Sequence, residues 1–276
     1  MRKVLITGTS SGIGRATAQF LAERGYFVYA GVRQKAHLQI WEGVKNVKAM
    51  LFDVRRDDEI NQVVEQIKTE AGGLYALVNN AGISNWGPIL DIPNEVFRDN
   101  LETNLLGPIK VTRAFLPLLN GNSARIINIS SVSGKLIFPF MGPYHVAKAA
   151  LEAFSDTLRR ELLINEMRNI KVVVVEPGSV ATRLWDRAEA TTVFAPSSPF
   201  YQTALSVGHA IIKQERAGAF PPELVSRAVW KALSVRRPKG RYIVSPQSLF
   251  FKLLLRLPDS WLDRLAYLIM RRHRRP

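Results

Sequence analysis

Two kinds of hydrophobic pattern alternate along the chain, continuous apolar runs and apolar residues at helical spacing. Short, continuously apolar runs, typical of strands buried on both faces, lie at residues 3–7, 26–32, 47–52, 74–78, 125–129 and 170–175. Between them, apolar residues recur with helical spacing, which predicts amphipathic helices at residues 12–24, 57–71, 94–119 and 142–165, the third bent at Pro108. Strands and helices that alternate in this way predict an α/β fold, a doubly wound parallel sheet with helices on both faces.

The pattern changes after Pro177. Residues 183–222 are rich in proline, serine, threonine and aromatic residues, show no strand pattern, and predict only one short helix. A long insertion after a late strand is either a substrate lid or a plain surface excursion, and the aromatic residues favour the lid. Pro221 and Pro222 then open a helix that runs to Val235, and residues 241–244 form a last strand. We therefore expect one catalytic domain over residues 1–246.

Residues 247–276 predict a helical C-terminal extension. The apolar segment at 249–257 is too short and too charged to span a bilayer, and Pro258 separates it from a second helix that ends in an arginine-rich run. In that helix Trp261, Leu262, Leu265, Leu268 and Ile269 can share one face. Two interpretations stay open: the extension binds an anionic membrane surface, or it packs on the domain or on a second subunit.

The charge is concentrated at the end of the chain. The 276 residues carry 38 Lys and Arg against 23 Asp and Glu, a net charge of +15. Residues 227–276 hold 13 basic and 2 acidic residues, so +11 of that charge lies there and the rest of the chain is nearly balanced. A nucleic-acid-binding enzyme would spread basic residues over a face that includes its site, so we expect no nucleic acid partner.

Composition also limits the chemistry. The chain has no cysteine, which excludes disulfides, thiolate catalysis and cysteine-ligated metals, and its four histidines have no ligand spacing, so we expect no metal site. The first strand begins too early to leave room for a secretory signal, and we expect a cytoplasmic protein.

A glycine-rich turn joins the first strand to the first helix. Residues 7–14 read T-G-x-x-x-G-x-G. Any tight turn can use glycine for positive φ, but a strand before and a helix after favour a pyrophosphate site at the helix N-terminus. The predicted cofactor contacts here are Gly8, Ser10, Ser11, Gly12, Ile13 and Gly14.

The ends of the next strands predict the rest of a dinucleotide site. At the second strand end, Arg33 stands where an NAD-selective chain would place an acid, which favours NADP(H); a solvated arginine is the alternative. After the third strand, Asp53 and Val54 are expected to face the adenine, although Asp53 could instead cap the following helix. After the fourth strand, Asn80, Ala81 and Gly82 are small enough for a cofactor to lie against the backbone.

A tyrosine and a lysine carry the candidate chemistry. Tyr144 and Lys148 are four residues apart at the start of a predicted helix, so they project from one face, and Ser131 ends the preceding strand. A free phenol has a pKa of about 10, and a neighbouring ammonium would lower it toward a usable acid or base. Each element alone is common, whereas their conjunction is rare.

Over residues 3–182 these motifs resemble the classical short-chain dehydrogenase/reductase family, which has a Rossmann-like fold. The match comprises the glycine turn, Asp53, the N-N-A-G run at 79–82, Asn104, a serine thirteen residues before the tyrosine, Y-x-x-x-K, and the 177–182 segment. The resemblance implies that Tyr144 is the general acid in carbonyl reduction and that Ser131 hydrogen-bonds the substrate oxygen. It also implies that Lys148 binds the nicotinamide ribose and lowers the phenol pKa, and that Asn104 anchors a water in the proton relay.

By the same resemblance, the segment after the sixth strand lines the nicotinamide carboxamide; its predicted contacts are Pro177, Gly178, Val180 and Thr182. Residues 30–33 and 176–182 look most similar to the retinol and hydroxysteroid dehydrogenase branch, whose substrates are large and apolar. Residues 138–141 fit such a pocket, and His145 is expected at the helix surface or pocket rim.

The sequence therefore predicts an NADP(H)-dependent oxidoreductase that transfers a hydride between nicotinamide and a secondary alcohol or ketone. We expect the substrate to be steroid-, retinoid- or lipid-like and the enzyme to be a homodimer or homotetramer. The alternative is a scaffold protein that binds NADP(H) without turnover.

Overall fold

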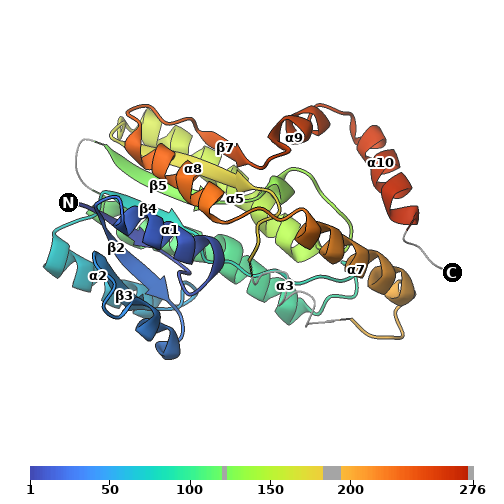
Figure 1. Ribbon diagram of the computed structural model, residues 1–276, viewed down its shortest axis with the longest axis horizontal. Coiled ribbons are helices and arrows are strands. Elements are labelled where there is room, and N and C mark those ends of the chain that lie inside the picture. Colours follow the sequence, from blue (N-terminus) through green and yellow to red (C-terminus); the bar gives the residue numbers. More distant parts are fainter. Residues whose placement is uncertain (120–122, 183–193, 273–276) are drawn as a thin grey trace.

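A single parallel sheet organises the computed structural model, which describes residues 1–119, 123–182 and 194–272 (Figure 1). Its seven strands lie in the order β3-β2-β1-β4-β5-β6-β7. The strands are β1 (Arg2–Ile6), β2 (Tyr26–Val32), β3 (Val47–Leu51), β4 (Ala76–Asn79), β5 (Ala124–Ile129), β6 (Ile170–Pro177) and β7 (Arg241–Val244). The strand order reverses between β1 and β4, which confirms the predicted doubly wound α/β fold and sets a binding crevice at the strands' carboxyl ends.

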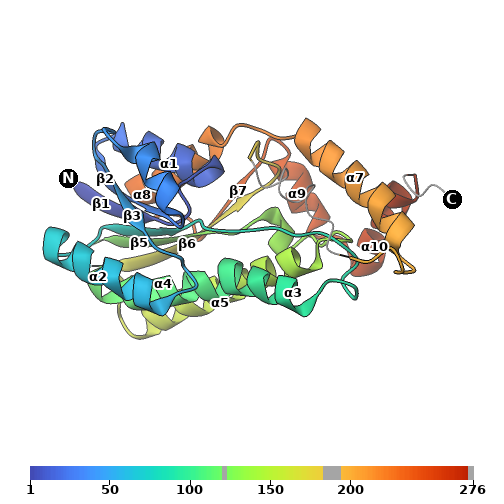
Figure 2. The same cartoon turned by 90° about the horizontal axis from the view of Figure 1, so that it is seen from below.

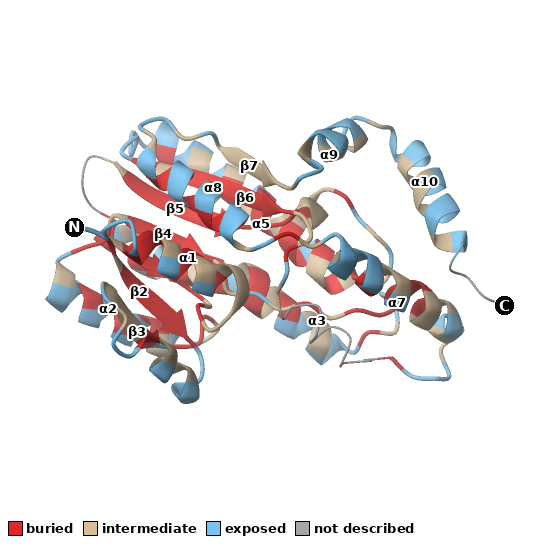
Figure 3. Ribbon diagram, viewed as in Figure 1, coloured by how far each residue is buried: buried red, intermediate tan, exposed pale blue. Residues whose placement is uncertain are grey.

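Helices cover both faces of the sheet (Figure 2). On one side lie α1 (Gly12–Ala22) and α8 (Glu223–Ser234); on the other lie α2 (Asp57–Ala71), α4 (Gly107–Phe115) and α5 (Gly142–Ile164). Along β1, Val4 and Ile6 belong to the core on the α1 and α8 side, whereas Leu5 belongs to the core on the other side. Both faces of the strand are buried, which explains the continuous apolar runs in the sequence (Figure 3).

The helix predicted over residues 94–119 is interrupted. It consists of α3 (Asn94–Leu101), a π-helical turn η2 (Glu102–Leu106), α4 and the short 3-10 turn η3 (Leu116–Leu118). Pro108 has no N–H to donate to the Asn104 carbonyl four residues earlier, so the regular ladder cannot pass this point. The irregularity therefore lies just before Pro108, in the turn that carries Asn104. Other 3-10 turns are η1 (Lys35–Trp41) and η4 (Val132–Gly134).

The prediction of only one short helix in the 183–222 insertion is wrong. Residues 183–193 lie outside the described part of the chain, and α7 (Tyr201–Ala217) fills 17 residues of the remainder. Gly208 lies at the middle of α7 against the Trp86 ring; a Cβ there would come 2.2 Å from Trp86 Cζ3. The missing side chain lets the helix approach the domain closely, a packing reason for glycine that periodicity does not show.

Two C-terminal helices project beyond the β7 edge and extend toward α7 (Figures 1 and 2). They are α9 (Ser248–Leu254) and α10 (Asp259–Arg271), and neither contains a buried residue. The predicted helical extension is thus present, as an appendage whose residues stay at least partly exposed (Figure 3). Among the described residues, no helix combines the length and the apolar character needed to cross a membrane.

Candidate active site

A cavity of about 560 Å³ lies at the carboxyl ends of the strands, within the size range of small-molecule sites. Every predicted site residue except Asn104 contributes to its wall: Gly8, Ser10, Ser11, Gly12, Ile13, Gly14, Arg33, Asp53, Val54, Asn80, Ala81, Gly82, Ser131, Tyr144, Lys148, Pro177, Gly178, Val180 and Thr182. Asn104 is fully buried directly behind Gly82, so it supports the wall without lining it. Residues from eight loops and helices thus meet at one place.

The glycine turn leaves hydrogen-bond donors directed at this cavity. Gly8 has φ +70° and Gly12 φ +56°, and a Cβ on Gly8 would lie 2.7 Å from the Ala81 Cα. Ser11 is the N-cap of α1 and its side chain makes no capping hydrogen bond. The first N–H groups of α1 therefore keep no protein partner from this cap, and they fit the phosphates of a dinucleotide.

The end of β2 offers a cation at the same cavity. Arg33 is exposed, lines the wall beside Gln34 and His37, and makes no ion pair with any described residue. Its position suits the predicted pairing with a 2′-phosphate. No group of three or more histidine or acidic side chains arranged to hold a metal ion occurs in the described ranges.

Asp53 is held by a neighbour rather than by a helix end. Arg55 donates to both of its carboxylate oxygens, at 3.1 Å from Nε to each and 2.8 Å from Nη2. Burial opposes ionisation, but the hydrogen bonds from Arg55 outweigh it and lower the pKa of Asp53. The N-cap of α2 is Arg56, without a side-chain cap bond, so the capping alternative for Asp53 is wrong.

The loop after β4 is tied to the glycine turn. Asn80 Nδ2 donates to the carbonyls of Thr7, at 2.9 Å, and Gly8, at 3.0 Å. Asn104 bonds the backbone of Ile83 in both directions, each at 2.9 Å. A Cβ on Gly82 would come 2.9 Å from Asn104 Oδ1 and 3.9 Å from Lys148 Nζ. Asn104 thus fixes the 80–83 loop, which passes close to Lys148.

Ser131, Tyr144 and Lys148 form the polar centre of the cavity. The Tyr144 phenol shares a hydrogen bond with Ser131, whose Oγ also donates to the Pro177 carbonyl at 3.3 Å. Lys148 Nζ lies 5.6 Å from the centroid of the Tyr144 ring and donates to the Ile129 carbonyl at 2.8 Å. The spacing of four residues therefore brings the two side chains together, as predicted, at the strand end that carries Ser131.

The pKa values differ from the simplest expectation. Burial raises the pKa of Tyr144 to about 12; its hydrogen bond with Ser131 lowers that pKa, and the negative charge of Glu215 raises it further. Burial also lowers the pKa of Lys148 to about 8, although the charge of Glu152 opposes this. The expected lowering of the phenol pKa by Lys148 is absent, because desolvation dominates and the ammonium is directed at a backbone carbonyl.

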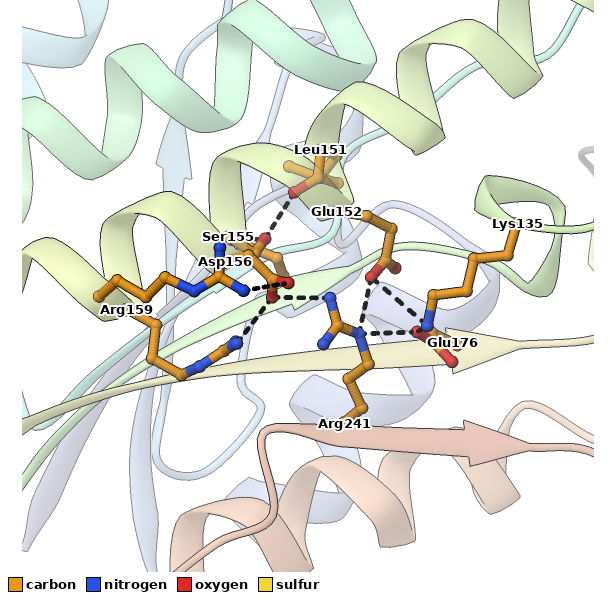
Figure 4. Close-up of polar contacts among 10 residues, drawn as sticks. Lys135, Leu151, Glu152, Ser155, Asp156, Arg159, Glu176 and Arg241 are labelled. Carbon is orange, nitrogen blue, oxygen red and sulfur yellow. Dashed lines mark hydrogen bonds and ion pairs between the residues drawn. The ribbon is translucent and has the colours of Figure 1, made fainter. Parts of the chain in front are cut away.

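An ion-pair network joins α5 to β6 and β7 (Figure 4). Glu152 on α5 and Glu176 on β6 are almost fully buried, and Arg241 on β7 joins them, with Nε 3.1 Å from Glu152 and 3.3 Å from Glu176. Lys135 also pairs with Glu176, and Arg241 reaches Asp156 at 2.6 Å. The network fixes α5, which carries Tyr144 and Lys148, to the two strands beside the cavity.

The prediction for His145 is wrong. The residue is buried rather than at the surface or rim. Its Nδ1 lies 2.8 Å from the Ser133 carbonyl, and its Nε2 accepts from the Phe138 N–H at 3.2 Å. Burial lowers the pKa of His145, so the neutral ring holds the 133–138 loop against α5. Of residues 138–141, Phe138 and Met141 line the cavity, whereas Pro139 and Phe140 lie against a small adjacent space beside Trp86.

Two sets of cavity residues escaped sequence reasoning. The first is the apolar wall from the C-terminal helices: Phe250, Phe251, Leu254, Leu262, Leu265, Ala266, Ile269 and Met270. The second is the polar pair Ser179 and Glu215, the latter from α7. The apolar face of α10 was visible in the sequence, but nothing in its periodicity indicates which surface it meets. Glu215 is an isolated acid in an insertion, which carries no motif.

Comparisons with known proteins agree with this geometry. A family model described as short chain dehydrogenase matches residues 2–192. The chain is 34% identical to an NADPH-dependent 3-dehydrocapnine reductase of Ornithobacterium rhinotracheale, over 97% of this chain and 96% of that protein. It is 33% identical to a 3-ketodihydrosphingosine reductase of Bacteroides thetaiotaomicron, over 94% of each.

The structural comparison and a hydroxysteroid enzyme extend this similarity. A short-chain dehydrogenase from Streptomyces avermitilis superposes with a TM-score of 0.79 at 29% identity, over 98% of this chain and 97% of that chain. A 17-beta-hydroxysteroid dehydrogenase type 6 of Bos taurus is 33% identical over 94% of this chain and 86% of that protein, in line with the hydroxysteroid resemblance. The chain belongs to the short-chain dehydrogenase family, and its fold and motif order make it an oxidoreductase that acts on CH–OH or C=O groups with a nicotinamide cofactor.

Proposed function

We propose that this protein is an NADP(H)-dependent reductase of a long-chain lipid ketone. The observation that carries the proposal is the meeting of Ser131, Tyr144 and Lys148 at a cavity with one dinucleotide-binding side and one apolar side. When bound, the nicotinamide would supply the hydride. The chain's own residues would orient the ketone and deliver the proton.

We assign the roles as follows. Ser131 donates a hydrogen bond to the carbonyl oxygen, and Tyr144 gives its phenol proton to the same oxygen as hydride arrives at carbon. A phenol with a pKa of about 12 is protonated at neutral pH, so it is in the form that donates and favours the reductive direction. Lys148 binds the nicotinamide ribose. Asn104 fixes the adjoining loop and anchors a water in the relay through which the phenol regains its proton.

The preference for NADP(H) rests on Arg33. Its guanidinium, which forms no ion pair with the residues that the structure describes, suits bidentate pairing with a 2′-phosphate. The word NADPH-dependent in the name of the Ornithobacterium relative supports the same choice. The glycine turn and the uncapped N-terminus of α1 would hold the pyrophosphate, and Asp53, Val54 and the 177–182 segment would line the two ends of the cofactor.

The apolar wall indicates the substrate class. Side chains of α9 and α10 line the cavity on the side away from the glycine turn, and a long hydrocarbon chain would bury its surface against them. The names of two relatives, a 3-dehydrocapnine reductase and a 3-ketodihydrosphingosine reductase, support a lipid ketone over a steroid or retinoid. In this proposal residues 1–246 form the catalytic domain, α7 forms the lid side, and 247–276 completes the lipid side.

We also propose that the extension brings the cavity to an anionic membrane surface. Trp261, Tyr267 and Leu268 on α10 are each more than half exposed, and the arginine-rich end of the chain follows. A lipid ketone could then enter the cavity between α7, α9 and α10. The homodimer or homotetramer stays a prediction, which light scattering of the purified protein would check.

Turnover with a matched variant tests the function. NADPH oxidation is followed with a long-chain 3-ketone for the wild type and for Tyr144→Phe, which keeps the ring and removes the proton. We expect the variant to bind NADPH normally and to lose at least about 100-fold in kcat, the scale of general acid catalysis. A wild-type protein that binds NADPH but reduces no ketone would favour the scaffold alternative. Full activity in Tyr144→Phe would remove Tyr144 from its role.

A further inference from the structure

An acidic side chain with no assigned role faces the reaction centre. Glu215 lies in the last turn of α7 and lines the same cavity as Ser131, Tyr144 and Lys148. Its carboxylate accepts a hydrogen bond from Ser179 Oγ. Among the described residues no lysine, arginine or histidine forms an ion pair with it. Glu215 is therefore a half-buried negative group of the cavity wall that has no ion-pair partner among the described residues.

The surroundings make this carboxylate unfavourable in isolation. Ile211, one turn earlier on α7, and the side chains of α9 and α10 give the neighbouring wall its apolar character. Burial raises the pKa of Glu215, which shows that the charged form is poorly solvated there. A partly buried carboxylate is stabilised in its charged form by a cationic partner, and the hydrogen bond that it accepts here comes from the neutral hydroxyl of Ser179. A cation from outside the protein would complete the pair.

Glu215 and Ser131 are both held by one short segment of the chain. The carbonyl of Pro177 accepts from Ser131, and Ser179, two residues further on, donates to Glu215. Two extended residues span at most about 7 Å, so the groups that hold Ser131 and Glu215 lie on neighbouring parts of the cavity wall. The charge of Glu215 raises the pKa of the Tyr144 phenol, which places the two groups in the same electrostatic environment.

We propose that Glu215, oriented by Ser179, binds the ammonium group of an amino ketone whose amine is on the carbon next to the reacting carbonyl. The inference rests on the proposed function and narrows it, because it requires a substrate with a positive head and a long apolar chain. The head would pair with Glu215, the carbonyl oxygen would face Ser131 and Tyr144, and the chain would follow the wall of α9 and α10. Ketones of the same length without an amine would leave Glu215 unpaired.

The experiment compares two alcohols, assayed in the oxidative direction with NADP⁺ because the amino alcohol is chemically stable. One is a long-chain 2-amino-3-alcohol and the other is the same alcohol without the amine. The variant is Glu215→Gln, which keeps the shape and an oxygen that accepts from Ser179. The control is Glu223→Gln, which removes an exposed carboxylate at the start of α8, outside the cavity.

For the amino alcohol we expect Glu215→Gln to lower kcat/KM by about 10- to 100-fold, mainly through KM, as for loss of a hydrogen-bonded charge pair. For the plain alcohol we expect a clearly smaller loss, so the ratio of kcat/KM for the amino alcohol to kcat/KM for the plain alcohol should fall by about 10-fold or more, and Glu223→Gln should behave as wild type with both. Equal losses with both alcohols would show a merely structural effect and overturn the inference. Turnover of neither alcohol by the wild type would contradict the proposed function.

Binding without turnover tests Glu215 separately. Calorimetry with a long-chain primary alkylamine and the alcohol of equal length, each in the presence of NADPH, measures the preference for the cation directly. We expect the wild type to bind the amine at least about 10-fold more tightly and Glu215→Gln to bind the two alike. If wild type shows no preference, or if Glu215→Gln keeps it, the inference is wrong whatever the protein turns over.

Discussion

Individual side chains at the cavity show how burial sets their chemistry. Burial shifts the pKa values of both Lys148 and Tyr144 so that the neutral form is favoured, the lysine pKa down to about 8 and the tyrosine pKa up to about 12. A low dielectric disfavours either charge. Tyr144, the proposed acid, therefore stays protonated. The charged ammonium of Lys148, which we propose binds the ribose, lowers the stability of the folded protein.

That cost gives a stability prediction for Lys148. Its pKa is about 8 in the fold against about 10.5 when unfolded, so between these values the unfolded chain binds more protons, and stability rises with pH. Below pH 8 the full penalty applies. We expect Lys148→Met to raise the free energy of unfolding at pH 7 by about 1–3 kcal/mol and to abolish turnover. The gain in stability is smaller than the full desolvation penalty because the variant also loses the hydrogen bond to the Ile129 carbonyl.

Denaturant unfolding at a series of pH values measures this. The advantage of Lys148→Met should shrink steadily as pH rises from 8 to 10.5, because the folded lysine is neutral in this range and the cost of removing the proton that the unfolded chain still holds falls as pH approaches 10.5. A difference that is independent of pH would mean that Lys148 carries no desolvation penalty in the folded protein.

Arg33 decides between two cofactors that differ by one phosphate. We expect Arg33→Asp to weaken NADPH by at least about 10-fold in Kd and to leave NADH within about 2-fold or improve it, because the carboxylate repels a 2′-phosphate and accepts from a 2′-hydroxyl. Fluorescence titration of both cofactors measures this. Arg24→Ala, an exposed charge outside the cavity, is the control. A wild type that prefers NADH would refute the assignment.

At the scale of elements, the site depends on how α5 is fixed to β6 and β7. The helix carries Tyr144 and Lys148 near its N-terminal end. Glu152 of α5 and Glu176 of β6 both form ion pairs with Arg241 and with Lys135, which ties the helix to the strands (Figure 4). Neither the helix pattern nor the strand pattern alone indicates this pairing. The two glutamates would be costly without it, since burying an unpaired carboxylate is unfavourable.

This network gives a prediction for Arg241. Arg241→Ala leaves Glu152 without its closest cation, whereas Lys135 still pairs with Glu176. Because Arg241 is partly exposed, we expect a loss of about 2 kcal/mol in the free energy of unfolding, below the full penalty of a broken buried pair. Arg237→Ala, an exposed arginine before β7, should change it by less than about 0.5 kcal/mol. Thermal unfolding of both variants checks this, and equal effects would contradict it.

At the scale of the whole molecule, the C-terminal extension serves two surfaces. Leu262 and Leu265 line the cavity, while Trp261 and Leu268 face outward, so the single apolar face read from the sequence is divided in the structure. Deleting the extension would remove a cavity wall together with any membrane contact. Point variants on each side separate the two roles.

We expect Trp261→Ser with Leu268→Ser to abolish binding to anionic vesicles while NADPH reduction of a short soluble ketone is unchanged. Leu265→Ser should do the reverse, raising KM for a long-chain ketone without releasing the protein from vesicles. Wild-type binding should fall in high salt but persist in part, because arginines and buried apolar area both contribute. Vesicle sedimentation measures this. A wild type that ignores anionic vesicles would leave the extension as a wall of the cavity only.

The sequence by itself determined the sheet, the order of its motifs and most of the polar residues that meet at the cavity. Continuous apolar runs and helical periodicity are local patterns, and the motifs that follow each strand must meet because the carboxyl ends of parallel strands share one edge. The strand ranges of β2 and β7 and the helix range of α2 agree with the patterns residue for residue. The meeting of Ser131, Tyr144 and Lys148 could be predicted from the residue spacing within one helix and the end of the strand before it.

Tertiary structure alone decided what lies across from those residues. The packing of α7 against Trp86 and the cavity wall from α10 depend on contacts between segments far apart in sequence. The burial of His145 and the pairing of Asp53 with Arg55 are shorter-range contacts that hydrophobic periodicity does not show. Glu215 shows the reason most clearly. Its place beside Ser179 follows from the path of a 40-residue insertion with no motif, and its chemical meaning comes from burial next to Tyr144, which no local pattern encodes.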